Sequence, residues 1–158
     1  MKKKIKNKKI MVIASHNSGK IKEMVFFLKK LNIKIFSAKD FNLSEPIENG
    51  KTFQENALIK ARYVNKKVKK ISVADDSGLV IPILNGKPGI FSARWAGKNK
   101  NFNVAMKKLS NLIFKKRVNA YYISVLAICW NKKKEKVFIG KVFGKIVWPP
   151  RGNLGFGY

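Results

Sequence analysis

The sequence predicts an α/β fold with a mixed, mostly buried central sheet and flanking helices. Short apolar runs of strand length alternate with segments whose apolar residues recur at helical spacing, and no internal repeat or low-complexity linker separates them. The expected order is β-α-β-α-β-β-α-β-β. The chain has 158 residues, 46% of them hydrophobic, which is enough apolar surface for one core. We predict a single domain over residues 1–158, with a basic extension at residues 1–9.

The first part of the chain predicts a strand, a loop, a helix and a second strand. Ile10–Ala14 is a continuous apolar run that predicts a buried strand. Apolar residues at helical spacing from Ile21 to Leu31 predict a helix, and Ile33–Ser37 predicts a short strand. After a polar loop, a capping-box pattern predicts that a second helix begins at Thr52.

The middle of the chain predicts two strands and a helix. Ile71–Ala74 predicts a strand that runs into Asp75-Asp76-Ser77-Gly78, which leaves two carboxylates at a strand end. Leu79–Leu84 predicts a further strand that ends in an Asn85-Gly86 turn. Apolar spacing from Phe102 to Ile113 predicts a third helix.

The last part predicts paired strands at Ala120–Trp130 and Lys136–Val147, joined by a turn at Asn131–Lys134. Cys129, the only cysteine, lies in the first of these strands and predicts a buried thiol in a reducing compartment. The apolar stretch after the basic start is too short for a signal peptide, so we expect a cytoplasmic protein without a membrane span.

The net charge of +27 would normally indicate a nucleic-acid or acidic-membrane partner. However, Lys outnumbers Arg by 31 to 4, and Arg is the residue that bidentate phosphate and base recognition favours. The Lys, Ile and Asn excess is typical of drift in an AT-rich genome. We therefore expect no specific nucleic-acid function and no membrane partner.

Acidic residues are scarce and concentrated, since six of the eight lie between positions 40 and 76. A hard cation such as Mg²⁺ would therefore have to bind there. Asp75 and Asp76 are consecutive, so their side chains should point in different directions and only one should reach a shared metal or water. The alternative is an Asx turn. Glu55 has a competing role in the capping box, whereas Glu48 has no such obvious structural role.

Residues Ser15–Lys20 are a candidate phosphate site, because a strand, a Ser/Gly turn and a helix start present backbone N–H groups to an anion. A P-loop pattern fails here, since it needs Gly in place of Ala14 and Ser or Thr in place of Ile21. The structural alternative is that Ser18 caps the helix. His16 has no evident nucleophile or orienting carboxylate beside it, which favours a simple loop residue.

Six motif blocks in order make the sequence resemble the inosine triphosphate pyrophosphatase family, whose members hydrolyse non-standard purine nucleoside triphosphates such as ITP, dITP and XTP. The blocks are Ala14–Lys20, Gly50–Ala57 with Lys60-Ala61, Ala74–Leu79, Pro88–Arg94 with Gly97, the Gly140 and Gly144 pair, and Arg151–Tyr158. These blocks favour this family over the septum-associated Maf type, whose phosphate loop also follows a first strand.

The resemblance implies two lobes around a nucleotide cleft, a homodimer and a set of site residues. The substrate-binding residues implied are Ser15, His16, Asn17, Ser18, Gly19, Lys20, Ser77, Phe156, Gly157 and Tyr158, with Phe156 stacking on a 6-keto purine. The metal ligands implied for Mg²⁺ are Asp76 and an acid of the Glu45–Glu48 loop, with Glu48 preferred over Glu45 and Glu55. Asp76 is also the implied catalytic residue, which orients or deprotonates a water that attacks the α-phosphorus and releases pyrophosphate.

The family continues after Gly-Phe-Gly-Tyr with Asp-Pro and a Ser-His-Arg motif, whereas the given sequence ends at Tyr158. We therefore expect a C-terminal base-binding segment to be missing. The alternative function is a catalytically impaired remnant that at most binds nucleotides or RNA through its basic surface.

Overall fold

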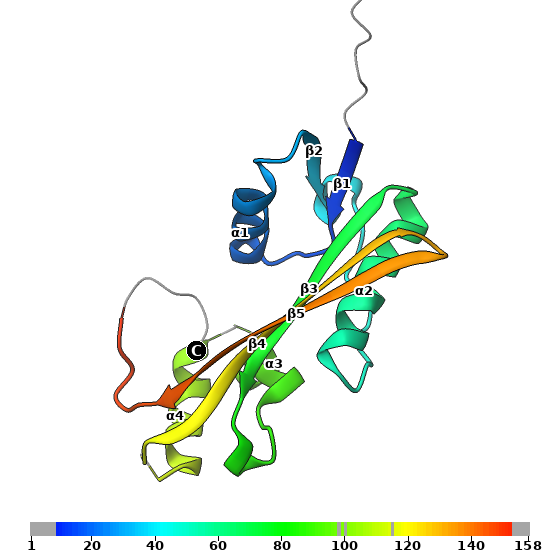
Figure 1. Cartoon of the computed structure of the whole chain (residues 1–158). Coiled ribbons are helices and arrows are strands. Elements are labelled where there is room, and N and C mark those ends of the chain that lie inside the picture. Colours follow the sequence, from blue (N-terminus) through cyan, green and yellow to red (C-terminus); the bar gives the residue numbers. More distant parts are fainter. Residues whose placement is uncertain (1–8, 98, 100, 115, 153–158) are drawn as a thin grey trace, which may run out of the picture. The chain divides into compact units, whose positions relative to one another are not determined.

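The computed structural model describes residues 9–97, 99, 101–114 and 116–152 (Figure 1). Its strands are β1 (Lys9–Ile13), β2 (Ile33–Ser37), β3 (Ile71–Val80), β4 (Val118–Asn131) and β5 (Lys134–Ile146). Its helices are α1 (Ser18–Leu28), α2 (Phe53–Val68), α3 (Ser92–Trp95) and α4 (Phe102–Leu112), with 3₁₀ turns at Ala38–Phe41, Pro82–Leu84 and Gly89–Phe91. None of the described helices has both the length and the apolar character needed to span a membrane.

The five strands form one sheet in the order β2-β1-β3-β4-β5, which confirms the predicted α/β class. β1 pairs in parallel with both β2 and β3. β4 and β5 form a hairpin around a two-residue turn, where the Lys133 N–H donates to the Asn131 side chain at 2.9 Å. The predicted strand at Ile33–Ser37, the three long helices and the hairpin are confirmed, with shifts of a few residues at their ends.

The chain divides into two compact units. The described part of the first comprises residues 9–50, 54–75 and 126–138. That of the second comprises residues 51–53, 76–97, 99, 101–114, 116–125 and 139–152. β3, β4 and β5 each contribute residues to both units.

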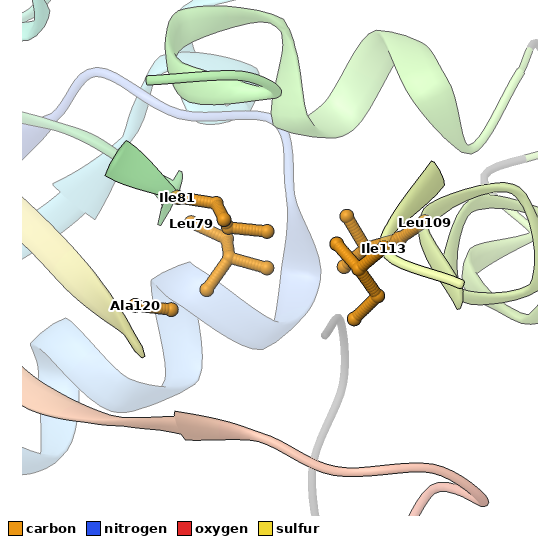
Figure 2. Packing of buried hydrophobic residues seen from close by; sticks show 5 residues of the cluster. All are labelled: Leu79, Ile81, Leu109, Ile113 and Ala120. Atoms are coloured by element: carbon orange, nitrogen blue, oxygen red, sulfur yellow. The ribbon is translucent and has the colours of Figure 1, made fainter. Parts of the chain in front are cut away.

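Each unit has its own buried apolar residues. In the first unit, the β1 residues Val12 and Ile13 are fully buried with Ala61 and Val64 of α2, and Cys129 is buried as predicted. In the second unit, a cluster joins β3, α4 and β4 (Figure 2). Its members are Leu79, Ile81, Leu109, Ile113 and Ala120.

Two predictions for the middle of the chain are wrong. β3 does not end before the acidic residues but continues through them to Val80, so Asp75-Asp76-Ser77-Gly78 is neither a strand end nor an Asx turn. The strand predicted at Leu79–Leu84 does not form, because the chain leaves β3 after Val80 and makes a 3₁₀ turn at Pro82–Leu84. β3 neighbours β4 in the sheet and is buried from Ser72 to Asp76, and such a setting accommodates residues of low strand propensity. Pro82 has no N–H for a ladder.

Candidate active site

The first candidate element is the loop between β1 and α1 in the first unit. The Ala14 N–H donates to the Val73 carbonyl at 2.7 Å, which fixes the start of the loop against β3. Asn17 is the N-cap of α1, and its Oδ1 accepts from the N–H groups of Gly19 at 2.9 Å and Lys20 at 3.3 Å. The alternative that Ser18 caps this helix is therefore wrong, because Ser18 already lies inside its first turn.

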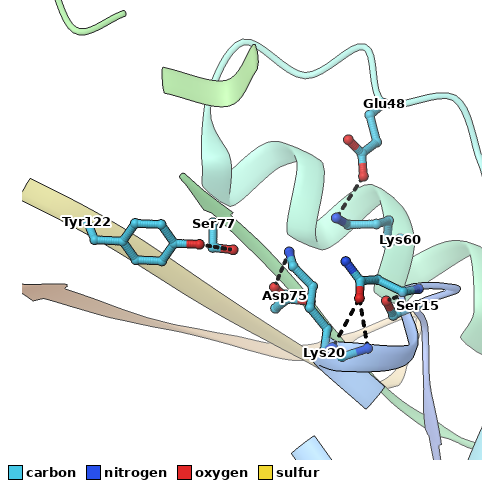
Figure 3. Close-up of polar contacts among 9 residues, drawn as sticks. Ser15, Lys20, Glu48, Lys60, Asp75, Ser77 and Tyr122 are labelled. Carbon is cyan, nitrogen blue, oxygen red and sulfur yellow. Dashed lines mark hydrogen bonds and ion pairs between the residues drawn. The ribbon is translucent and has the colours of Figure 1, made fainter. Parts of the chain in front are cut away.

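Ser15 also supports the backbone of this loop, since its Oγ accepts from the Asn17 N–H at 3.2 Å. The loop thus ends in an ordered helix start whose dipole favours a bound anion. Lys20 brings a positive charge to the same turn, and its Nζ lies 2.6 Å from Oδ2 of Asp75 (Figure 3). Asp75 is 8% exposed, so this ion pair is largely removed from water.

Glu48 lies in the loop before α2, also in the first unit. Its Oε1 is 2.7 Å from Nζ of Lys60 on α2 (Figure 3). The expectation that Glu48 has no structural role is therefore wrong, because it already holds an ion pair. Its carboxylate nevertheless has the hard oxygen donors that Mg²⁺ prefers.

His16 also has partners that the sequence did not reveal. Its Nε2 lies 2.7 Å from the Leu43 carbonyl, and its Nδ1 lies 3.3 Å from Oε1 of Glu45. The expectation that no carboxylate lies beside His16 is therefore wrong. These partners are 27 and 29 positions away in the sequence, so no local pattern could have indicated them.

In the second unit, Asp76 and Ser77 occupy the middle of β3. Asp76 is only 8% exposed. Ser77 accepts a hydrogen bond from the Tyr122 hydroxyl on β4 at 3.3 Å (Figure 3). Asp75 and Asp76 belong to different compact units, and the expectation that only one of them reaches a shared metal or water stays a prediction.

Several predicted site roles stay predictions. Glu48 and Asp76 lie in different units, and within the described ranges no three His, Cys, Asp or Glu residues form a metal-binding group. Phe156, Gly157 and Tyr158 lie outside the described residues.

The sequence patterns gave no role to two residues that contact the candidate site residues. Lys60, which belongs to a motif block, pairs with Glu48, and Tyr122, predicted only as part of a strand, donates to Ser77. The position of Lys60 two turns into α2 was a usable signal, because it places a cation on the helix that follows the Glu48 loop. Nothing in the sequence indicated Tyr122.

Comparisons with known proteins show the family of this chain. The model of the Ham1 family matches residues 11–158. The dITP/XTP pyrophosphatase of Zymomonas mobilis is 41% identical over 152 residues, which cover 94% of this chain and 73% of that protein. The dITP/XTP pyrophosphatase of Thermoanaerobacter pseudethanolicus is 43% identical over 153 residues, which cover 94% and 76%.

Solved structures are similar over the same range. A HAM1 protein from Coxiella burnetii superimposes with a TM-score of 0.86 at 37% identity, covering 95% of this chain and 79% of that one. The Ham1 protein of Staphylococcus aureus gives a TM-score of 0.83 at 37% identity, covering 95% and 78%. A family match over nearly the whole chain, relatives above 40% identity and the same fold in solved structures establish that this chain belongs to the Ham1 family.

Proposed function

We propose that this protein hydrolyses non-standard purine nucleoside triphosphates, namely dITP, XTP and ITP, to the monophosphate and pyrophosphate. The observation that carries the proposal is the β1–α1 loop, in which Asn17 caps the start of α1 and Lys20 places a positive charge in its first turn, an arrangement that suits a bound phosphate. Relatives that are 41% and 43% identical to this chain bear the name dITP/XTP pyrophosphatase, which supports the choice of substrate.

In this proposal the first unit holds the triphosphate. Ser15 and Asn17 keep the loop backbone in place, while Lys20 supplies the charge that a phosphate oxygen requires. Before substrate binds, Asp75 balances the Lys20 charge. Because the nearly buried Asp75 holds the Lys20 side chain in one orientation, that side chain loses little conformational freedom when substrate binds.

Asp76 acts as the general base in this proposal. A water donates a proton to the Asp76 carboxylate as its oxygen forms a bond to the α-phosphorus, and the bond from that phosphorus to the oxygen bridging to the β-phosphorus breaks. The bridging oxygen leaves with pyrophosphate. A carboxylate with little exposure suits this role. Its negative charge is poorly screened by solvent, so it attracts the proton of a nearby water more strongly than an exposed carboxylate would.

Mg²⁺ is the proposed cofactor. Glu48 and Asp76 are the residues that would hold it, and their carboxylate oxygens fit the donor preference of this ion. In the structure, Glu48 pairs with Lys60. When bound, Mg²⁺ would neutralise charge that develops on the leaving pyrophosphate. Each ligand is testable separately, through the Mg²⁺ concentration that gives half-maximal rate in Glu48→Gln and Asp76→Asn.

The preference for a 6-keto purine is proposed from the resemblance, with Phe156 stacking on the base. A site built to hydrogen-bond one base edge leaves buried polar groups unpaired when the wrong base enters. The free-energy cost of these unpaired groups disfavours adenine.

A homodimer is also proposed from the resemblance, and light scattering after size-exclusion chromatography measures the oligomeric state.

The experiment that tests the function compares products from dITP, XTP, ITP and ATP with and without Mg²⁺. We expect pyrophosphate and the monophosphate from the first three, little from ATP, and loss of turnover with EDTA. Stepwise release of inorganic phosphate, or equal rates with ATP, would contradict the proposal. Salt-dependent RNA binding without turnover would favour the remnant alternative instead.

A further inference from the structure

We propose that His16 is a positioning residue rather than a substrate ligand: its imidazole fastens the phosphate loop to the segment that carries Glu45 and Glu48. The role rests on the proposed function insofar as it concerns catalysis. The contact itself is a property of the first unit and is testable without turnover.

Both ring nitrogens of His16 are engaged by this segment. A backbone carbonyl can only accept, so Nε2 carries a hydrogen and donates it to Leu43 at 2.7 Å. Nδ1 faces the Glu45 carboxylate at 3.3 Å. A phosphate could approach either nitrogen only after one of these contacts had broken, which argues against direct substrate binding.

The Leu43 carbonyl is a fixed anchor. The Leu43 N–H donates to the Ala38 carbonyl at 3.1 Å, and the Asn42 N–H donates to the Lys39 carbonyl at 3.0 Å. The segment is therefore held by the 3₁₀ turn at Ala38–Phe41, which directly follows β2. A hydrogen bond to so well-held an acceptor restrains the loop that donates it.

The loop on the other side of the contact is the phosphate loop itself. His16 lies between Ser15 and Asn17, the residues whose side chains order the backbone at the start of α1. Glu48 is only three residues beyond Glu45 and is held to α2 through Lys60. The His16 contact thus joins the anion site to the loop that carries the proposed metal ligand, within one compact unit.

The two contacts of His16 should differ in weight. Glu45 has a side chain that is 63% exposed, and ion pairs in water contribute little. The bond to Leu43 is shorter and only partly exposed, so it should carry most of the restraint. Removing the imidazole should therefore matter more than neutralising Glu45.

The test is hydrogen exchange of the backbone amides in residues 41–50, measured by mass spectrometry on the full chain. His16→Ala should speed exchange there about fivefold, the loss of one hydrogen bond. His16→Gln keeps an N–H that can reach Leu43 and should stay near the wild-type rate, with Glu45→Gln in between. Glu135→Gln, which removes an ion pair elsewhere in the same unit, is the matched control and should leave this segment unchanged.

Kinetics then separate positioning from simple structural support. In His16→Ala we expect KM for XTP to rise about fivefold with kcat nearly constant, and His16→Gln to restore KM. Unchanged exchange in His16→Ala, or a KM that glutamine does not restore, would overturn the inference. If the wild type fails to hydrolyse XTP, the proposed function fails, while the exchange experiment still decides whether His16 restrains the segment.

Discussion

Lys20 in the first turn of α1 and Asp75 on β3 form a largely buried ion pair, with 2.6 Å between Nζ and Oδ2. Removing one partner of such a pair leaves the other charge in a poorly hydrated place. A variant that changes only one of the two residues should therefore have a lower free energy of unfolding.

We expect Lys20→Met to lower the free energy of unfolding by about 2 kcal/mol, because it leaves Asp75 without this counter-charge. Lys20→Met with Asp75→Leu should recover part of that loss. Urea unfolding measures both, and Lys22→Met on the exposed side of α1 is the matched control. An equal loss in Lys22→Met would show that the ion pair is not the cause.

Glu135 and Arg62 make another ion pair in the first unit, in which Arg62 Nε donates to Oε2 at 2.8 Å. The Arg62 hydrogen bonds hold the pKa of Glu135 below its ordinary value of 4.5. The pKa is thus lower in the folded than in the unfolded chain. Ionised Glu135 therefore stabilises the fold above about pH 4.5, and this contribution is lost as the pH falls through the folded pKa.

Glu135→Gln should consequently be less stable than wild type near pH 7, by about 0.5 kcal/mol since both side chains are partly exposed. The difference should shrink as the pH is lowered towards about 3. Urea unfolding at both pH values measures it. A difference that grows in acid would contradict the assigned role of the Arg62 contact.

The sequence could single out candidate site residues but not the side chains that contact them. Lys20 and Asp76 were visible within motif blocks, and Glu48 was visible as an acid of the loop before the second helix. Their contacts were not, because Lys20 meets Asp75 across 55 positions, and Glu48 meets Lys60 only once α2 has formed. Pairing over such separations depends on tertiary packing.

β3 shows how packing decides the behaviour of an element. It passes from one compact unit to the other at the Asp75–Asp76 bond, and nearly all its residues are buried. Asp, Ser and Gly are poor strand formers, so the sequence predicted a break in the middle of this element. The register with β1 covers Ile71–Val73 of β3, so at the acidic residues burial in the sheet beside β4 outweighs the local preference.

Gly78 in β3 has no room for a side chain. A Cβ there would lie 2.5 Å from Ser92 Oγ and 2.6 Å from the Gly89 carbonyl oxygen, both in the second unit. The Ser92 hydroxyl is itself in use, since it accepts from the Leu79 N–H at 3.0 Å and donates to the Gly89 carbonyl at 2.6 Å.

We therefore expect Gly78→Ala to destabilise the protein by about 2 kcal/mol, because the backbone must shift and these hydrogen bonds must lengthen. Gly144→Ala in β5 is the matched control, since a Cβ there meets no atom within 4 Å. Thermal unfolding of both variants decides the point. Equal effects would show that the contact around Ser92 is not tight.

At the scale of the whole molecule, a chain of net charge +27 keeps its few carboxylates in ordered positions. In the described residues, Glu45, Glu48, Asp75 and Glu135 each lie within 4 Å of a cationic or imidazole nitrogen.

The fold class could be predicted from the sequence because the periodicity of apolar residues is a local property. The division of β3 to β5 between two units could not be predicted, because it depends on contacts far apart in the chain.

The measurement that tests the account most directly is the rate of pyrophosphate release from XTP, with Mg²⁺, in wild type and Asp76→Asn. Asparagine keeps the size of the side chain and removes the base, so kcat should fall at least about a hundredfold while KM changes little. Glu135→Gln, an acid that pairs with Arg62 in the other unit and has no proposed role in the site, should retain the wild-type rate. Equal rates in wild type and Asp76→Asn would contradict the role given to this carboxylate.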